Sequence, residues 1–411
     1  MIATLLLASL LIQDPPSELR VQDLQAHIGF LASDELEGRE SGERGEKLAV
    51  QYIVQQWERL GLKPIAPDGA YTLAFEAAGK KCTNTAALLP GTDPKLADQI
   101  LVIGAHHDHA GIGGPGSPGG MGNPGEIHNG ADDNASGTAG VIELAEWFAA
   151  HPTRRPILFM TFSAEERGLL GSADFVAHPP FPLQNIRAML NCDMIGRSSD
   201  GYLFLGGLGT ADEFHALLDP IIENSGLKVE KSDDGMAPSD NSSFHAAGVP
   251  ALFFFTHIHP DYHMPGDDAD KINYPGEVAV LQLVRAIVQA IQDHDGPLTF
   301  HERPEMGMPA DFNERMSEHF QHIMQRRSLH GSAGLRVIEA DGALVLDELR
   351  EEAPARKAGL QKDDRLVSVN GMPVADKEQL RRALASGQKG EVVTIVVRRG
   401  GAERQFQVTL E

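Results

Sequence analysis

Between residues 99 and 291, short apolar segments alternate with longer segments of helical periodicity, and this pattern leaves few folds open. Strands that are apolar along their whole length are usually buried on both faces, as in a parallel sheet covered by helices. We therefore predict an α/β fold with a mixed, mostly parallel, doubly wound sheet flanked by helices. The apolar segments cover residues 99–105, 156–164, 187–196, 202–205 and 249–256, and the helical segments cover 135–152, 211–226 and 275–291.

The pattern changes after Gly296. Residues 297–330 are polar and charged, so we interpret them as a linker with one helix at about 310–328. Residues 331–411 contain several short strand-like segments and predict a second, small β-rich domain. A length of 411 residues agrees with two domains, of which the larger would cover residues 17–296.

The N-terminus carries an apolar run from Ile2 to Ile12. This run is too short to span a bilayer, and we expect no transmembrane segment. It has the length of a signal-peptide core, although no Lys or Arg precedes it and no clear small-residue cleavage site follows it. We expect residues 1–16 to be a signal peptide and the protein to be exported, to the periplasm or the extracellular space. The alternative is an apolar N-terminal strand or helix.

The net charge and the number of cysteines exclude some classes of partner and site. The formal net charge of −23 argues against nucleic acid as a partner, because a phosphate backbone is bound by clustered Lys and Arg. Cys82 and Cys192 are the only cysteines. They could pair in an oxidising compartment, but two thiols make neither a disulfide framework nor a zinc cluster.

Side chains that bind metals follow the predicted strands. Ligands gather at the carboxyl ends of strands in doubly wound sheets, so a shared site is expected there. The candidates are His106 and Asp108 after the first strand, Glu165 and Glu166 after the second, Asp193 after the third, His263 after the last, and Asp132 and Asp133 before the helix at 135–152. Histidines and carboxylates without cysteine suit a hydrolytic zinc site with two ions, one bridging carboxylate and one carboxylate free to act as a base.

Periodicity alone does not show which residue of the stretch GAHHDHAG, at residues 104–111, would bind a metal. Side chains alternate along a strand, so 106 and 108 share one face while 107 and 109 share the other. The His106–Asp108 pair offers a ligand with an orienting carboxylate, whereas His107 and His109 have none. We expect His109 at most to line the mouth of the site.

Six motifs resemble, in order, those of the zinc-dependent aminopeptidases of peptidase clan MH. They are GAHHDH, IHNGADDNASG, FSAEERGLLGS, NCDMIG, PSDNSSF and YHMPGDDADKI, and the resemblance covers roughly residues 20–295. It implies two zinc ions bridged by Asp132, with His106 and Asp193 on one ion and Glu166 and His263 on the other. It further implies that Glu165 is the general base, that Asp108 holds the His106 imidazole through its other nitrogen, and that the Asp132–Asp133 peptide bond is cis.

Two points of this assignment carry alternatives. The segment THIHPDYHMP also contains His257 and His259, either of which could replace His263 as the ligand. Asp240 in PSDNSSF is expected near the cleft, where it would order the site or the free amine of the substrate rather than bind metal.

The C-terminal segment resembles a PDZ domain of the kind found in bacterial proteases, with APARKAGLQKDDRLVSVNG as the core of the match. Such domains bind an extended peptide or a C-terminus at a sheet edge. The carboxylate-binding loop would lie at residues 332–337. The alternative is a domain that docks on the peptidase and only stabilises or gates it.

Together these features predict an aminopeptidase that acts on peptide substrates with two zinc ions per chain. A carboxypeptidase or a glutaminyl cyclase on the same fold is the alternative with similar residues. A peptide-binding adaptor with an inactive peptidase fold is the alternative from another class, but the complete ligand set argues against it.

Overall fold

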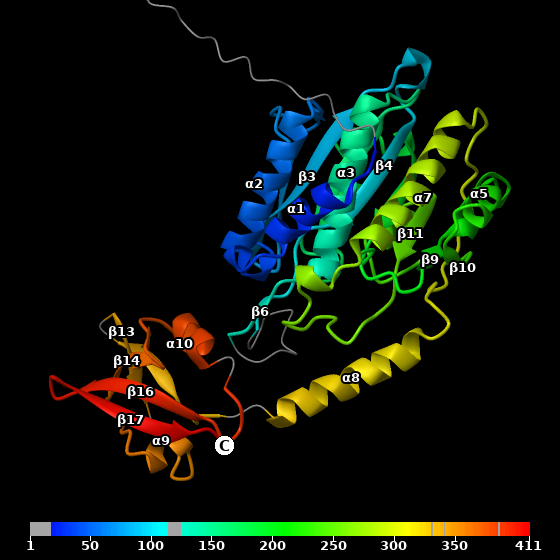
Figure 1. Ribbon diagram of the computed structural model, residues 1–411. Coiled ribbons are helices and arrows are strands. Elements are labelled where there is room, and N and C mark those ends of the chain that lie inside the picture. The colour runs from blue at the N-terminus through cyan, green and yellow to red at the C-terminus, as the bar shows by residue number, and fades with distance from the viewer. Residues whose placement is uncertain (1–17, 114–124, 330–331, 341, 348, 385–386) are drawn as a thin grey trace, which may run out of the picture.

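The computed structural model describes residues 18–113, 125–329, 332–340, 342–347, 349–384 and 387–411. It confirms the predicted α/β fold: a nine-stranded sheet runs in the order β1-β3-β7-β4-β8-β11-β9-β10, with β2 paired to β3 (Figure 1). The central strands β7, β4, β8 and β11 are parallel, whereas β9 runs antiparallel to β11 and the N-terminal strands are antiparallel. The strands are β1 (Lys63–Pro64), β2 (Thr72–Ala77), β3 (Lys80–Leu89), β4 (Ile100–His106), β7 (Ile157–Phe162), β8 (Ile186–Cys192), β9 (Tyr202–Gly206), β10 (Lys228–Lys231) and β11 (Ala251–Phe255).

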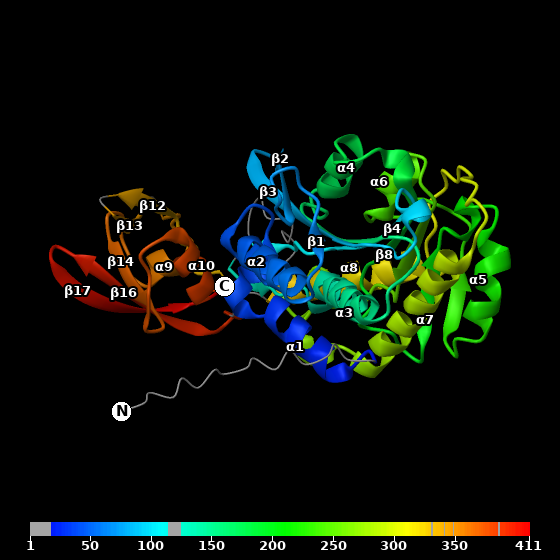
Figure 2. The ribbon, with the colours of Figure 1, turned by 90° about the horizontal axis from the view of Figure 1, so that it is seen from above.

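Helices cover both faces of this sheet (Figure 2). One face carries α1 (Val21–Leu31), α2 (Arg44–Arg59), α3 (Gly137–Ala150) and α7 (Tyr274–Asp293), and the other carries α4 (Leu170–Ala177) and α6 (Asn241–Ala246). The helix α5 (Phe214–Glu223) packs against α7. The apolar residues of β4, β7 and β8 are buried on both faces, which explains their uninterrupted apolar sequence. The short helices α4 and α6 and the strand β10 were not anticipated, because each is too short to show a clear period.

The Gly/Pro-rich stretch at 112–126 lies mostly outside the described residues. Its ends form the small ladder of β5 (Gly111–Ile112) and β6 (Ile127–His128). The expected signal peptide at residues 1–16 also lies outside the described residues. In the part of the chain that is described, no helix is both long and apolar enough to cross a membrane.

The predicted linker does not stand apart from the larger domain. Phe300 and Met306 form bridges to Ala211 and Met236, so this segment packs along the sheet domain. The helix α8 (Phe312–Leu329) follows, close to the predicted bounds. Its first turns carry Phe312 and Met316, which pack against an apolar cluster at the ends of β8 and β11. The first part of the linker is therefore part of the larger domain, where apolar residues spaced among charges anchor it.

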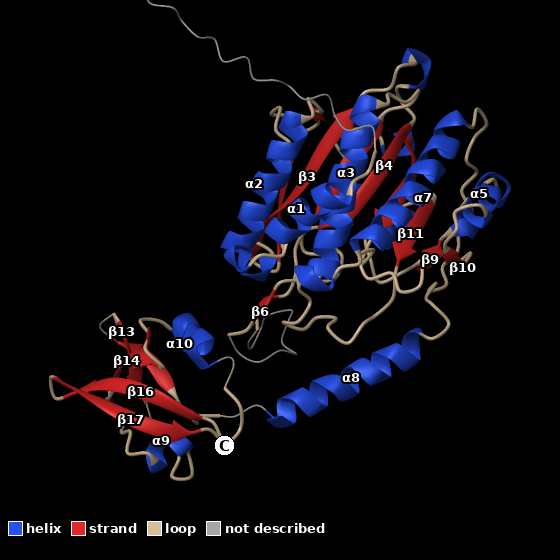
Figure 3. Cartoon of the chain, viewed as in Figure 1, coloured by secondary structure: helices blue, strands red, loops and turns tan. Residues whose placement is uncertain are grey.

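The C-terminal residues form a separate β-rich unit beyond α8, as Figure 3 shows by its red strands. Its six-stranded sheet runs β12-β13-β14-β16-β17, with β15 paired to β14, around its own core of Leu344, Leu346, Val369, Ile395 and Val397. The elements are β12 (Val337–Ala340), β13 (Ala343–Leu346), α9 (Pro354–Lys357), β14 (Arg365–Val369), β15 (Met372–Pro373), α10 (Lys377–Leu384), β16 (Val392–Arg399) and β17 (Ala402–Thr409).

Candidate metal centre

The carboxyl ends of the central strands deliver the candidate ligands to one place. His106 is the last residue of β4, Asp193 follows β8 directly, and Glu165 and Glu166 lie three and four residues after β7. His263 comes from the loop after β11. Because parallel strands end at the same edge of the sheet, residues distant in sequence meet there, as the sequence predicts.

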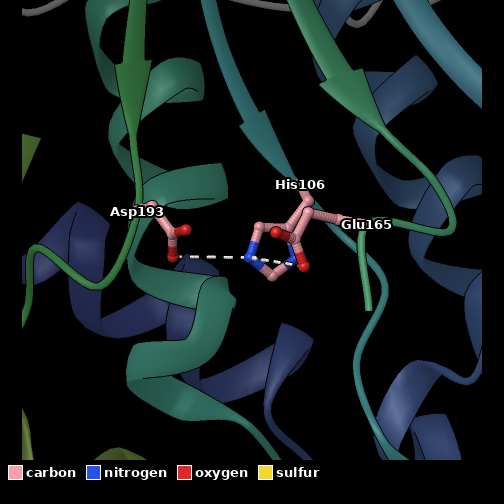
Figure 4. A group of neighbouring side chains, drawn as sticks. All are labelled: His106, Glu165 and Asp193. Atoms are coloured by element: carbon pink, nitrogen blue, oxygen red, sulfur yellow. Dashed lines mark hydrogen bonds and ion pairs between the residues drawn. The ribbon is translucent and has the colours of Figure 1, made fainter. Parts of the chain in front are cut away.

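The first group of ligand atoms consists of His106, Glu165 and Asp193 (Figure 4). The Nε2 atom of His106 lies 3.4 Å from Oδ1 of Asp193 and 4.0 Å from Oε2 of Glu165. The imidazole is 1% exposed, and the two carboxylates are 10% exposed. This side of the site is therefore nearly closed to solvent.

The second group lies on the other side of Asp133. Nε2 of His263 is 3.1 Å from Oδ2 of Asp133 and 3.1 Å from Oε2 of Glu166. Nδ1 of His109 is 2.7 Å from Oε1 of Glu166. Among the described residues, His109, Asp133 and Glu166 form the second set whose ligand atoms all lie within 4.8 Å of one another.

Asp133, rather than Asp132, lies between the two groups. Its Oδ1 is 3.3 Å from Nε2 of His106, and its Oδ2 is the oxygen that faces His263. The carboxylate of Asp132 points away from both groups: Oδ1 accepts the backbone amide of Gly196 at 2.7 Å, and Oδ2 lies 3.3 Å from His259. The carboxylate that lies between the two groups is thus one residue further along the chain than the sequence predicts.

A buried carboxylate fixes the loop in this orientation. Oδ2 of Asp267 accepts the backbone amides of both Asp132 and Asp133, at 2.9 and 3.0 Å. The cis peptide bond is also displaced, because it joins Asp133 to Asn134 and not Asp132 to Asp133. Asp267 is distant from both aspartates in sequence. The motif GADDNASG alone therefore does not show which of the two aspartates faces the ligand groups.

Asp108 differs from the prediction as well. Nδ1 of His106 contacts the backbone carbonyl of Asp108 at 3.2 Å, whereas the nearest carboxylate oxygen of Asp108 is 3.8 Å away. That carboxylate instead accepts the hydroxyl of Ser41 at 2.6 Å and the backbone amide of Glu165 at 3.1 Å. Asp108 therefore orients His106 through its main chain and supports Glu165 through its side chain.

The remaining candidates can now be placed. His107 turns away from the ligands, toward Thr161, and His259 faces Asp132. His257 stacks on Tyr202 beside Asp311, so neither alternative to His263 lies with the two groups.

Asp240 is fully buried, and burial raises the pKa of its carboxyl to about 7. Cys82 and Cys192 are both free and buried, so the pairing that the sequence left open is not formed in this structure.

His109 is the ligand-type residue that sequence reasoning set aside. The alternation that paired it with His107 holds only along a strand, and β4 ends at His106. Beyond that residue the backbone leaves β4, and His109 forms an isolated bridge with Glu40. The number of histidines in GAHHDHAG was the one signal in the sequence that could have kept His109 among the candidate ligands.

The adjacent glutamates have opposite electrostatic environments. Burial raises the pKa of Glu165 well above its usual range, and the neighbouring Asp193 and Glu166 act in the same direction against His106. Burial acts to raise the pKa of Glu166 too, but His263 and His109 outweigh it and lower this pKa to about 2. The two environments therefore favour a proton on Glu165 and an ionised carboxylate at Glu166.

The donor set fits a metal of the zinc class. The two groups present imidazole nitrogens and carboxylate oxygens without thiolates, the combination of hydrolytic zinc sites. In the described part of the chain, Oε1 of Glu166 and both ring nitrogens of His109 are buried without hydrogen-bond geometry to any partner. Buried polar atoms are normally satisfied, so these atoms indicate a bound cation.

Comparisons with known proteins identify two regions of the chain. Residues 84–288 match the model described as Peptidase family M28, and residues 331–410 match the PDZ domain model. Aminopeptidase YwaD of Bacillus subtilis is 29% identical over 216 residues, which cover 49% of this chain and 43% of that protein. The chain spans about half the length of the curated relatives it matches.

Two solved structures show the breadth of the fold. BSAP, a zinc aminopeptidase from Bacillus subtilis, aligns with a TM-score of 0.54 at 18% identity, over 71% of this chain and 100% of that chain. A glutaminyl cyclase from Porphyromonas gingivalis aligns with a TM-score of 0.54 at 16% identity, over 66% of this chain and 98% of that chain. The two family-model matches assign residues 84–288 to peptidase family M28 and residues 331–410 to the PDZ domain family.

Proposed function

We propose that the protein is an aminopeptidase that removes N-terminal residues from peptides and uses two zinc ions per chain. The observation that carries this proposal is the arrangement of two ligand groups on the two oxygens of one carboxylate, Asp133. His106 and Asp193 would hold one ion, and Glu166 and His263 the other. The relatives named aminopeptidases and the match to Peptidase family M28 support the choice of reaction.

Bound at this place, zinc would polarise the scissile carbonyl as a Lewis acid and lower the pKa of water. The chain supplies the proton transfers. Glu165 takes a proton from the attacking water and passes it to the leaving amine as the carbon–nitrogen bond breaks. Its backbone amide donates to Asp108, and burial raises the pKa of its carboxyl, which makes the carboxylate a stronger base for the first transfer.

One experiment separates this proposal from its alternatives. Zinc per chain would be measured by mass spectrometry, together with turnover on aminoacyl anilides, on N-blocked peptides with a free C-terminus and on peptides with N-terminal glutamine. We expect two zinc ions per chain and hydrolysis of the aminoacyl anilides only, with release of the amino acid and the aniline. Cleavage confined to N-blocked peptides would indicate a carboxypeptidase, ring closure of glutamine a cyclase, and no turnover with zinc bound an inactive adaptor. Each of these results would overturn the proposal.

We also propose that the PDZ domain binds an extended peptide or a protein C-terminus. The strand β12 ends the sheet order and pairs with β13 alone, which leaves an edge for an added strand. A cavity of about 1010 Å³ borders the expected carboxylate-binding loop, and its wall carries Arg336, Arg350 and Arg356 together with Glu351 and Glu352. Fluorescence anisotropy with peptides bearing a free or an amidated C-terminus tests this binding. Equal or absent binding of the two peptides would favour a docking or gating role.

Export is the last part of the proposal. It is supported by the apolar run at residues 2–12. N-terminal sequencing of the mature protein from cell fractions tests it. A mature chain that begins near residue 17 in an extracytoplasmic fraction is expected, and an intact chain confined to the cytoplasmic fraction would contradict it.

A further inference from the structure

We propose that His109 is an additional ligand, so that the ion on the Glu166 side is held by one more protein side chain than the ion on the His106 side. This inference rests on the proposed function, because it concerns the same pair of ions. It adds a residue outside the set that the motif resemblance implied.

The atoms around His109 point to a shared cation. Nδ1 of His109 lies 2.7 Å from Oε1 of Glu166 and 3.7 Å from Oδ2 of Asp133. Despite the short distance, neither Nδ1 nor Oε1 has hydrogen-bond geometry to any described residue. Two buried atoms that lie close together but are not aligned for a hydrogen bond suit coordination of one ion better than they suit each other.

The ring of His109 is held rigidly in this place. Its backbone amide donates to the carbonyl of Arg39 at 3.1 Å, and its side chain is 0% exposed. Gly130 packs against the ring so closely that a Cβ atom there would lie 2.4 Å from Cδ2 of His109. The ring of His263 meets it edge-on, with centroids 5.7 Å apart. A side chain fixed in this way is preorganised for coordination.

The extra ligand makes the two halves of the site unequal. The Oδ2 side of Asp133 then offers four protein ligands, from Asp133, Glu166, His263 and His109, the number that closes a tetrahedral zinc site. The Oδ1 side offers three, from Asp133, His106 and Asp193, and three ligands leave a position open as in catalytic zinc sites. Glu165 lies on the Oδ1 side, 4.0 Å from His106, where a base is needed.

The test uses the full chain loaded with zinc. Zinc stoichiometry and both dissociation constants would be measured by chelator competition for the wild type, for His109→Ala and for the control His107→Ala. His107 is matched because it is also 0% exposed but contacts Thr161. We expect His109→Ala to lower the affinity for one zinc ion by roughly 100-fold or more and to leave the other ion bound. This loss exceeds the roughly 10–100-fold effect of changing a residue that only contacts a ligand. The control should keep both constants.

X-ray absorption on the wild type gives a second readout that needs no variant. Three histidine ligands on two ions predict about 1.5 imidazoles per zinc, whereas His106 and His263 alone predict about 1.0. Two tightly bound ions with about 1.0 imidazole each, or unchanged zinc constants in a folded His109→Ala variant, would overturn the inference and leave the proposed function intact. A wild type that binds no zinc would overturn both.

Discussion

The backbone amide of Glu165 donates to Oδ1 of Asp108 at 3.1 Å. The other oxygen of Asp108 accepts the hydroxyl of Ser41 at 2.6 Å, so both oxygens of this fully buried carboxylate are used for positioning. Asp108 is therefore a positioning residue, which acts on the proposed base through the main chain that carries it.

Replacement of Asp108 should lower turnover without removal of zinc. Asp108→Ala leaves the Glu165 amide without its acceptor, and we expect kcat to fall roughly 10–100-fold with a small change in KM. Ser41→Ala is the matched control, because it removes one bond to the same carboxylate and should cost only a few-fold. Steady-state kinetics with zinc analysis measures both variants. Loss of zinc from Asp108→Ala would show that Asp108 supports the ligands rather than the base.

Glu165→Gln should abolish most turnover while both ions stay bound. The amide cannot accept the proton of the attacking water, and loss of a general base commonly costs 10²–10⁴-fold, so we expect a fall of about that size. Glu166→Gln is the neighbouring control and should lose zinc, because Glu166 contacts His263 and His109 as an ionised group. Substantial activity in zinc-loaded Glu165→Gln would contradict the assigned role.

The two adjacent aspartates should separate cleanly by metal content. Asp133→Asn removes the carboxylate that faces both His106 and His263, so we expect weaker binding of both ions. Asp132→Asn should keep both ions, because this side chain contacts Gly196 and His259 instead. Zinc per chain after dialysis measures the difference. Retained zinc in Asp133→Asn with loss in Asp132→Asn would restore the assignment made from the sequence.

These two aspartates also show which parts of the site can be predicted from the sequence. His106, Glu165, Glu166, Asp193 and His263 could be anticipated to meet, because each follows a strand and strand ends coincide at one sheet edge. Which of two neighbouring aspartates faces inward depends on Asp267, which is more than 130 residues away in sequence. No local period encodes such a contact. The position of His109 was missed for a similar reason, since a strand period was applied beyond the end of β4.

A buried acid on α7 should make stability depend on pH. Glu277 is 0% exposed, and neither of its carboxylate oxygens has a hydrogen-bond partner among the described residues. Burial raises its pKa well above its ordinary value, and Asp132 and Glu143 act in the same direction. The folded state therefore prefers the protonated acid. The pKa of a glutamate in the unfolded chain is about 4.5. The stabilisation from protonated Glu277 is fully present below that pH, and it is lost as the pH rises through the higher pKa of the folded state.

Glu277→Gln should remove this dependence. The neutral amide has no charge to bury, so we expect the variant to be more stable than the wild type by about 1–3 kcal/mol at pH 8 and to be equal to it near pH 4. Thermal unfolding across this range measures the difference. Glu58→Gln changes an exposed glutamate and should stay within about 0.5 kcal/mol at every pH. A variant less stable than the wild type at pH 8 would refute the prediction.

Arg39 should be the strongest single contributor to the stability of the loops that frame the site. Its guanidinium is buried and donates to four carbonyl oxygens, those of Leu31, His107, Asn129 and Gly130. Burial lowers its pKa to about 10, so the group is still charged at neutral pH. These bonds join the end of α1 to the segments that carry His106, His109 and Asp133.

Arg39→Ala removes one hydrogen bond from each of those carbonyls and empties a buried site, and we expect a loss of roughly 3–5 kcal/mol in the free energy of unfolding. Arg39→Lys should recover little of this loss, because an ammonium group lacks the planar fork that reaches several carbonyls at once. The control is Arg44→Ala, which removes an exposed side chain paired with Glu37 at 3.3 Å and should cost about 0.5 kcal/mol or less. Chemical denaturation of the three variants measures the difference, and equal losses at the two arginines would contradict the assigned role of Arg39.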